Sequence, residues 1–197
     1  MSTGMDSYNI LITGAAGVGK TLLATQFTGD GMTDLEPRSS ADDDHVLCRA
    51  LRVDNRMCAV QLIDAVESGV PDDHESRFRP IHAVALIYSV TDRASFERIE
   101  ALHELTRSPR GGRERIVVLL ANKCDAAYRR EVSREEGKML AEKLECVVFE
   151  TSAKTMQNVH AAFVAIVRQI RERKETELRE GARGMRTASR SPRCLIL

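Results

Sequence analysis

The stretch Gly14-Ala15-Ala16-Gly17-Val18-Gly19-Lys20-Thr21 decides the fold of this chain. It matches G-x-x-x-x-G-K-[ST], the pattern of a phosphate-binding loop between a strand and a helix. Small residues let backbone N–H groups curl around phosphate oxygens, and the helix that follows adds a favourable dipole. The pattern predicts that Lys20 reaches the β- and γ-phosphates and that the Thr21 hydroxyl binds Mg²⁺.

The residues on either side of this loop support the interpretation. Residues 8–12 are short and apolar enough for a buried strand, and an apolar helical spacing begins at Leu22. We therefore include Leu22 with residues 14–21 in the predicted nucleotide-binding segment. A chance glycine-rich turn is the alternative, but it would not explain a strand, a helix, a lysine and a threonine in register.

Length and composition limit the class of protein. A chain of 197 residues, of which 43% are hydrophobic, predicts one globular domain with a sizeable core. The 29 basic and 29 acidic residues balance, so charge indicates no nucleic-acid partner. The five cysteines include no C-x-x-C pair, which favours a reduced, intracellular protein without a zinc site. We expect no secretory signal and no membrane-spanning helix.

Strand-like and helix-like runs alternate along the rest of the chain. Strands are predicted at residues 8–12, 46–53, 57–63, 83–90, 116–121 and 146–150, and helices after the loop and at residues 95–106, 133–144 and 159–170. This alternation predicts an α/β fold of three layers, with helices on both faces of a mostly parallel six-stranded sheet. The long polar stretches 28–45 and 65–80 predict functional loops.

Two short motifs, each directly after a predicted strand, indicate which nucleotide binds. In Asn122-Lys123-Cys124-Asp125, the Asp125 carboxylate can accept two hydrogen bonds from the guanine edge, a donor pair that adenine lacks. Asn122 can brace the phosphate-binding loop, and the Lys123 stem can lie over the ring. In Thr151-Ser152-Ala153-Lys154, the backbone N–H of Ala153 would donate to the guanine oxygen.

Asp64 ends the third predicted strand. Taken alone, it would be an ordinary residue of a strand-terminating turn. After a phosphate-binding loop, however, it stands where a carboxylate holds Mg²⁺ through water. Because ligands bind beyond the carboxyl ends of parallel strands, we expect Asp64, the loop and both motifs to lie together.

These features together resemble those of a Ras-type small GTPase. The resemblance covers residues 8–174 and implies a GTPase domain there, with a flexible lead-in at residues 1–7. We expect the tail at residues 175–197 to be partly helical at first and then disordered. It implies a monomeric GDP/GTP switch that uses Mg²⁺ and is assisted by exchange factors, GTPase-activating proteins and effectors. It also implies a first-switch hydroxyl on Mg²⁺, for which Ser39 is the candidate and Ser40 the alternative.

The second switch departs from the family pattern D-x-x-G-Q. Glu67 replaces the glycine whose N–H touches the γ-phosphate, and Ser68 replaces the glutamine that orients the attacking water. The alternative is that the loop is shifted and Gly69 is the displaced glycine, but no glutamine follows it. Ala16 stands where the family usually has glycine, and its methyl would crowd an arginine finger. The aromatic residue over the guanine has no counterpart, the nearest position being Met32.

Nucleotide binding is thus better supported by the sequence than efficient hydrolysis. We predict slow hydrolysis in which Lys20 acts at the phosphates and Glu67 and Ser68 are the residues left in the catalytic positions. A GTP-binding scaffold with little or no hydrolysis is the alternative. A small-molecule kinase is a third hypothesis, against which Asn122-Lys123-Cys124-Asp125 argues.

The carboxyl end carries a second signal, Cys194-Leu195-Ile196-Leu197. It fits C-a-a-X, in which the cysteine is prenylated and a terminal leucine favours geranylgeranyl. Residues 181–193 before it contain Arg183, Arg186, Arg190 and Arg193 and no acid. A single lipid chain anchors only marginally, so this basic segment would supply a second attraction to an anionic leaflet. We expect a lipid-anchored protein on the cytoplasmic face of a membrane, with the plasma membrane favoured.

Overall fold

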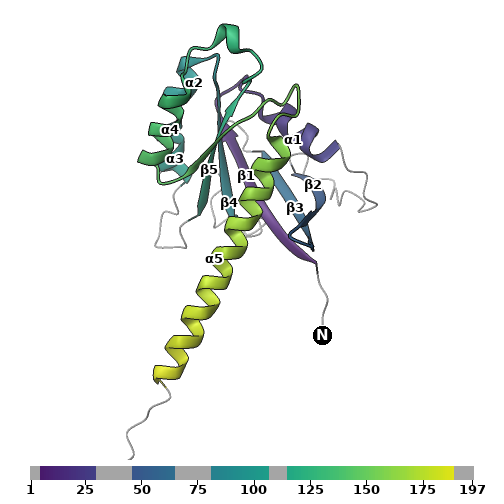
Figure 1. Ribbon diagram of the computed structural model, residues 1–197, viewed down its shortest axis with the longest axis vertical. Helices are drawn as coiled ribbons and strands as arrows, with labels where there is room; N and C mark the ends of the chain where they lie inside the picture. The colour runs from purple at the N-terminus through teal and green to yellow at the C-terminus, as the bar shows by residue number, and fades with distance from the viewer. Residues whose placement is uncertain (1–4, 30–45, 65–80, 107–114, 189–197) are drawn as a thin grey trace, which may run out of the picture.

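The computed structural model describes residues 5–29, 46–64, 81–106 and 115–188 of the chain. Along these residues strands and helices alternate as the sequence predicts (Figure 1). The strands are β1 (Asp6–Gly14), β2 (Val46–Val53), β3 (Arg56–Asp64), β4 (Ala83–Ser89), β5 (Ile116–Asn122) and β6 (Val147–Glu150). The helices are α1 (Lys20–Gly29), α2 (Arg93–Glu97), α3 (Ile99–Thr106), α4 (Arg134–Lys143) and α5 (Val159–Ala188), with a 3-10 turn η1 at Ala127–Arg129.

The strands form one six-stranded sheet in the order β2-β3-β1-β4-β5-β6. The neighbours β2 and β3 run antiparallel, and all other neighbouring strands run parallel. The hairpin between β2 and β3 turns at Asp54 and Asn55, whose φ values of 48° and 62° are those of a two-residue type I′ turn. The predicted sheet is therefore confirmed, and the carboxyl ends of five strands meet at one edge.

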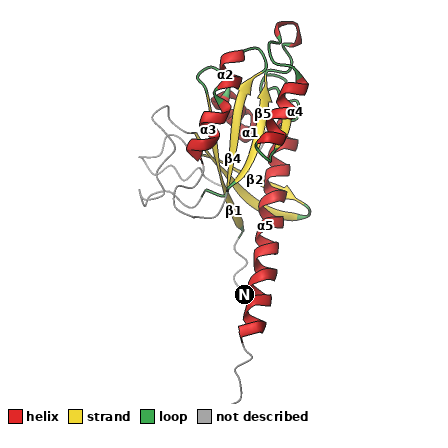
Figure 2. Cartoon of the chain, turned by 90° about the vertical axis from the view of Figure 1, so that its left-hand side faces the viewer, coloured by secondary structure: helices red, strands yellow, loops and turns green. Residues whose placement is uncertain are grey.

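Helices cover both faces of the sheet (Figure 2). Strand β4 is buried along its whole length, and its side chains alternate between two cores. Ile87 joins the core beneath α1 and α5, where the Phe27 and Phe163 rings lie 4.1 Å apart between centroids. Leu86 joins the core beneath α3 and α4. This packing explains why the central strands are apolar at every position rather than at every second one.

The helices differ from the prediction mainly at their ends. The helix expected at residues 95–106 begins earlier, because the Asp92 side chain accepts hydrogen bonds from two backbone N–H groups and caps α2, and it is interrupted at Arg98. The capping box expected at the start of α4 is present, with Ser133 and Glu136 satisfying each other's backbone N–H groups. Helix α5 continues far beyond its apolar stripe and leaves the body of the domain (Figure 1).

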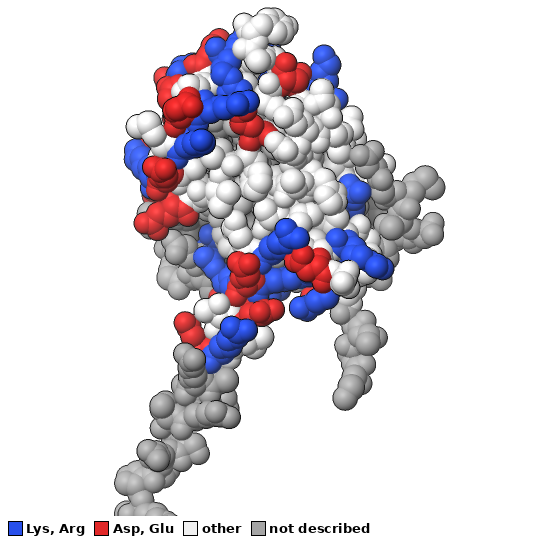
Figure 3. Space-filling view, viewed as in Figure 1, with Lys and Arg blue, Asp and Glu red and all other residues white. Residues whose placement is uncertain are grey.

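Charges of both signs are interleaved over the face seen in Figure 3, around an uncharged centre. Where α5 leaves the domain, Lys and Arg side chains alternate with Asp and Glu in the same way. In the part of the chain that the structure describes, no helix has both the length and the apolar content needed to cross a bilayer.

Candidate functional site

The phosphate-binding loop lies between β1 and α1, and its glycines meet distinct geometric demands. Gly17 and Gly19 have φ values of 73° and 97°, in the left-handed region that favours glycine. A Cβ on Gly14 would lie 2.2 Å from the carbonyl oxygen of Ile87, and one on Gly19 would lie 2.6 Å from Asn122 Nδ2. The loop can therefore keep this shape against β4 and Asn122 only with glycine at these positions.

Lys20, the first residue of α1, folds back over the loop. Its Nζ donates to the carbonyl oxygens of Gly14 and Ala15, at 3.0 Å each. An ammonium group carries three donors, so one remains for a phosphate oxygen. Leu22, predicted to belong to the same segment, is 48% exposed on α1.

Thr21 and Asp64 meet beside the loop. The Thr21 hydroxyl donates to Asp64 Oδ2 at 3.3 Å. The two residues are neighbours because β1 and β3 run parallel, with Ile12 opposite Asp64. The second carboxylate oxygen of Asp64, Oδ1, is buried and has no hydrogen-bond partner among the described residues. A hydroxyl and a carboxylate with a free oxygen are ligands of the kind that Mg²⁺ takes, so this pair fits a Mg²⁺ ion.

Asn122, the last residue of β5, connects three segments. Its Nδ2 donates to the carbonyl oxygen of Val18 at 2.8 Å, which braces the phosphate-binding loop as predicted. Its Oδ1 accepts from the backbone N–H of Ala153 at 3.1 Å and from the Thr151 hydroxyl at 3.4 Å. The Ala153 N–H, for which we predicted a bond to the guanine oxygen, thus donates to Asn122 in this structure.

The next residues of the motif complete the connection. Lys123 has a φ of 65°, and its Nζ donates to the carbonyl oxygen of Gly17 at 2.7 Å, so its stem crosses towards the phosphate-binding loop. Asp125 Oδ1 accepts from the Ser152 hydroxyl at 2.7 Å. Ser152 is fully buried and Lys154 is exposed. The structure therefore brings both base motifs and the phosphate-binding loop together at one edge of the sheet.

Several predicted residues lie outside the described part of the chain. They are the first-switch candidates Ser39 and Ser40, Met32, the second-switch residues Glu67 and Ser68, and the lipidation residue Cys194. Ala16 is described, and it is exposed.

Sequence reasoning missed residues that support the Thr151–Lys154 loop from behind. The Asn158 side chain donates to the carbonyl oxygen of Glu150 at 2.8 Å, and the Gln157 carbonyl accepts from the backbone N–H of Ser152 at 3.1 Å. Asn158 has a φ of 57°. Asparagine adopts this left-handed backbone conformation more readily than most residues. An asparagine directly before the predicted last helix was therefore the one sequence signal for a supporting turn at this position.

Comparison with known proteins identifies the family. The model of the Ras family matches residues 9–172. The chain belongs to the Ras family. It is similar to the human GTP-binding protein GEM, with 34% identity over 179 residues that cover 89% of this chain and 60% of GEM. It is also similar to the human GTP-binding proteins RAD (36% identity, covering 89% of this chain and 58% of RAD) and REM 1 (34%, 94% and 63%).

This Ras-family chain thus spans roughly 60% of the length of these relatives.

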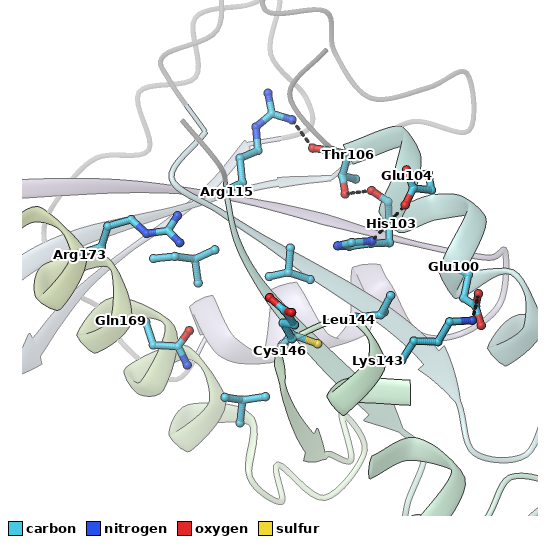
Figure 4. A pocket seen from close by; sticks show the side chains of 14 residues that line it. Glu100, His103, Glu104, Thr106, Arg115, Lys143, Leu144, Cys146, Gln169 and Arg173 are labelled. Atoms are coloured by element: carbon cyan, nitrogen blue, oxygen red, sulfur yellow. Dashed lines mark hydrogen bonds and ion pairs between the residues drawn. The ribbon is translucent and has the colours of Figure 1, made fainter. Parts of the chain in front are cut away.

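A hollow of about 760 Å³ lies at the other end of its sheet, where β5 and β6 begin (Figure 4). Its wall includes Cys146, and burial raises the pKa of that thiol to about 11, so the thiol is protonated at neutral pH. Because this hollow lies at the amino ends of the strands, it is separate from the loops that carry the family motifs.

Proposed function

We propose that this Ras-family chain binds GDP and GTP with Mg²⁺ and acts as a signalling switch that hydrolyses GTP slowly. The observation that carries the proposal is the meeting of four features at one edge of the sheet. These are the phosphate-binding loop, the Thr21–Asp64 pair, Asn122-Lys123-Cys124-Asp125 and Thr151-Ser152-Ala153-Lys154. The names of the relatives GEM, RAD and REM 1 as GTP-binding proteins support the same ligand.

Each part of the nucleotide has a candidate partner in this arrangement. Backbone N–H groups of residues 15–19 and the Lys20 ammonium would bind the phosphates. Thr21 and Asp64 would hold Mg²⁺, which when bound neutralises charge on the β- and γ-phosphate oxygens. The Asp125 carboxylate would accept from the guanine ring N–H and exocyclic amine, and the stem of Lys123 would cover the ring.

The proposal of slow hydrolysis rests on Ala16, Glu67 and Ser68. Ala16 places a methyl group on the exposed side of the phosphate-binding loop, where an arginine finger of an activating protein would enter. In the second switch, Glu67 replaces the glycine hinge and adds a negative charge, and Ser68 replaces the side chain that orients water. A protein that binds GTP with no hydrolysis at all is the limiting case of the same argument.

The carboxyl end supports attachment to a membrane. Prenylation at Cys194 would supply one anchor, and the arginines of residues 181–193 would add attraction to an anionic cytoplasmic leaflet, the plasma membrane being favoured. The alternating charges where α5 leaves the domain supply no such excess of positive charge (Figure 3). Partners would be an exchange factor, a GTPase-activating protein and effectors, as for Ras-like GTPases generally.

Two measurements test the proposal. First, the nucleotide that copurifies with the full chain should be guanine-based, and ATP should not displace it; release of an adenine nucleotide would refute guanine binding. Second, single-turnover hydrolysis of bound GTP should be slow and should rise when Ala16→Gly, Glu67→Gly and Ser68→Gln are combined. An unmodified rate that is ordinary for the family, or no change in the triple variant, would refute slow hydrolysis alone.

A further inference from the structure

Helix α1 is tied to the β2–β3 hairpin by a side-chain hydrogen bond near each of its ends. Near the start of the helix, the Thr21 hydroxyl donates to Asp64 Oδ2 at 3.3 Å, which is long for a bond between two oxygen atoms. Near its end, Arg49 Nη1 on β2 donates to the carbonyl oxygen of Phe27. Arg49 belongs to none of the sequence motifs of the nucleotide site, so its role must come from the packing around it.

The Arg49 side chain lies in the contact between β2 and α1. Alternate residues of a strand face the same side of the sheet, and Arg49 therefore shares its side with Leu51 and Val53, which are buried in the core beneath α1 and α5. Arg49 Cζ lies over the Phe27 ring, 5.1 Å from its centroid. Phe27 is fully buried and packs on Phe163. Arg49 therefore holds a residue that cannot shift without disturbing this core.

The carbonyl group that Arg49 holds lies in the last turn of α1. The helix ends at Gly29, so the Phe27 carbonyl is one of the last four, which have no partner within the helix. No residue of that last turn is basic. Arg49 thus supplies from β2 both a donor for this carbonyl and the positive charge that stabilises the carboxyl end of a helix.

This contact restricts how far Thr21 can move from Asp64. Thr21 and Phe27 belong to one helix and lie about 9 Å apart along it. Arg49 and Asp64 belong to one hairpin, in which β2 pairs with β3 along its whole length. When Arg49 holds Phe27, the helix cannot slide or tilt away from the hairpin, and Thr21 stays beside Asp64. The long, exposed bond between Thr21 and Asp64 is too weak to do this alone.

Mg²⁺ would be the ligand most sensitive to such a movement. It takes oxygen ligands at about 2.0–2.1 Å in nearly ideal octahedral geometry, so a small displacement of one ligand weakens its binding. Phosphate binding by backbone N–H groups and by the flexible Lys20 side chain tolerates a larger displacement. A change in the position of α1 should therefore alter Mg²⁺ binding before it alters nucleotide binding.

We propose that Arg49 is a positioning residue for Mg²⁺, which holds the end of α1 on β2 and so keeps Thr21 and Asp64 at the spacing that the ion needs. This proposal rests on the proposed function, because it requires that these two residues bind Mg²⁺ beside a nucleotide. Arg49 itself holds the opposite end of the helix and would touch neither the ion nor the nucleotide.

The test uses Arg49→Met in the full chain loaded with a fluorescent GDP analogue, because methionine keeps an apolar stem on Phe27 and removes the donor. The measured quantity is the free Mg²⁺ concentration that slows GDP release halfway. It should rise by about three- to tenfold, less than the roughly 10–100-fold typical when a direct partner of a metal ligand is lost. Arg52→Met, at an exposed position further along β2, removes the same charge and should leave this concentration within about twofold.

Release in excess EDTA separates positioning from a general loss of structure. Without Mg²⁺, GDP is held by the phosphate and base contacts alone, so Arg49→Met should release it within about twofold of the unmodified rate. Loosening of the whole domain would instead speed release equally with and without the ion. In an Asp64→Asn background, Arg49→Met should change the Mg²⁺ dependence little, because both changes act on the same pair.

The outcomes distinguish the two proposals. If Mg²⁺ slows GDP release from the unmodified protein, but Arg49→Met leaves the half-effective concentration within about twofold or speeds release equally in both conditions, the role of Arg49 is refuted and the proposed function stands. If Mg²⁺ has no effect on the unmodified protein, the proposed function fails and this inference fails with it. Should Arg49→Met not fold, Arg49→Gln, whose side chain is shorter and uncharged, decides between the same outcomes.

Discussion

Two arginines one turn apart on α5 reach the β2–β3 hairpin, and the structure predicts that they differ greatly in importance. Arg171 is 8% exposed, and its Nη1 donates to the carbonyl oxygen of Val53 at 2.7 Å. Longer bonds of 3.3 Å run to the carbonyl oxygen of Arg56 and the hydroxyl of Tyr8. Arg168 instead holds the exposed carboxylate of Asp54 with contacts of 2.6 and 3.0 Å.

The perturbation is methionine at each position in turn, since methionine keeps most of the apolar stem. In Arg171→Met, three hydrogen bonds from a buried guanidinium are lost. A hydrogen bond from a charged group contributes about 1.5–3 kcal/mol and the two longer bonds contribute less, so we expect a total loss of about 2–4 kcal/mol in the free energy of unfolding. In Arg168→Met, the lost ion pair is exposed and screened, and the loss should be much smaller.

The assay is guanidinium unfolding followed by circular dichroism, with GDP and Mg²⁺ at fixed saturating concentrations, because bound ligand adds to apparent stability. In a separate thermal unfolding experiment, the melting temperature should fall by about 2–4 °C for each kcal/mol lost in a chain of this length. Equal losses in the two variants, or a loss below about 1 kcal/mol in Arg171→Met, would refute the reasoning from burial.

Three further predictions follow from individual side chains. Asp125→Asn should weaken GTP binding and favour xanthine nucleotides, because the amide cannot accept from both guanine donors; unchanged affinity in a competition assay would contradict the role of Asp125. Cys194→Ser should release the protein into the soluble fraction of cells, and persistent membrane attachment would place the anchor elsewhere. Burial lowers the pKa of His82, and the nearby Lys174 ammonium lowers it further. The ring is neutral in the folded protein, because His82 Nδ1 accepts a hydrogen bond from the Asn9 N–H at 3.0 Å. The contribution of His82 to the free energy of unfolding should therefore be full above about pH 6.5 and be lost as the pH falls through the folded-state pKa, and in urea unfolding the free energy of His82→Asn should depend less on pH.

The sequence predicted the sheet and the meeting of its loops because both depend on local patterns. The glycines, lysine and threonine of residues 14–21 have fixed roles in one backbone shape, and each base motif follows an apolar strand. A parallel sheet then brings the ends of distant strands to one edge without further information. Ala153 shows the limit of this reasoning, because its N–H was expected to donate to the guanine oxygen and instead donates to Asn122, through loop positions that no local pattern gives.

Contacts between distant polar residues were beyond prediction. Arg171 directly follows the last apolar position of the α5 stripe, Ile170, and by composition it belongs to an exposed charged run. Only the packing of α5 against the hairpin makes it a buried donor to Val53. For a related reason α5, which ends at Ala188, is longer than the partly helical start that we expected for the tail. Charged helix formers, including the Glu175–Arg179 pair at 3.9 Å, extend it where no apolar face signals a helix.

The separation between binding residues and hydrolysis residues has a kinetic consequence. The proposed contacts to phosphate, Mg²⁺ and guanine lie on described strands and loops that hydrogen bonds connect, whereas the changes expected to slow hydrolysis are in the side chains of Ala16, Glu67 and Ser68. If hydrolysis is slower than nucleotide release, the lifetime of the GTP-bound state is set by release and by exchange factors. Residues that bind the base, Asp125 among them, would then control how long the switch stays on. Asp125→Asn should therefore shorten the GTP-bound lifetime in excess GDP without changing single-turnover hydrolysis, and equal changes in both rates would contradict this separation.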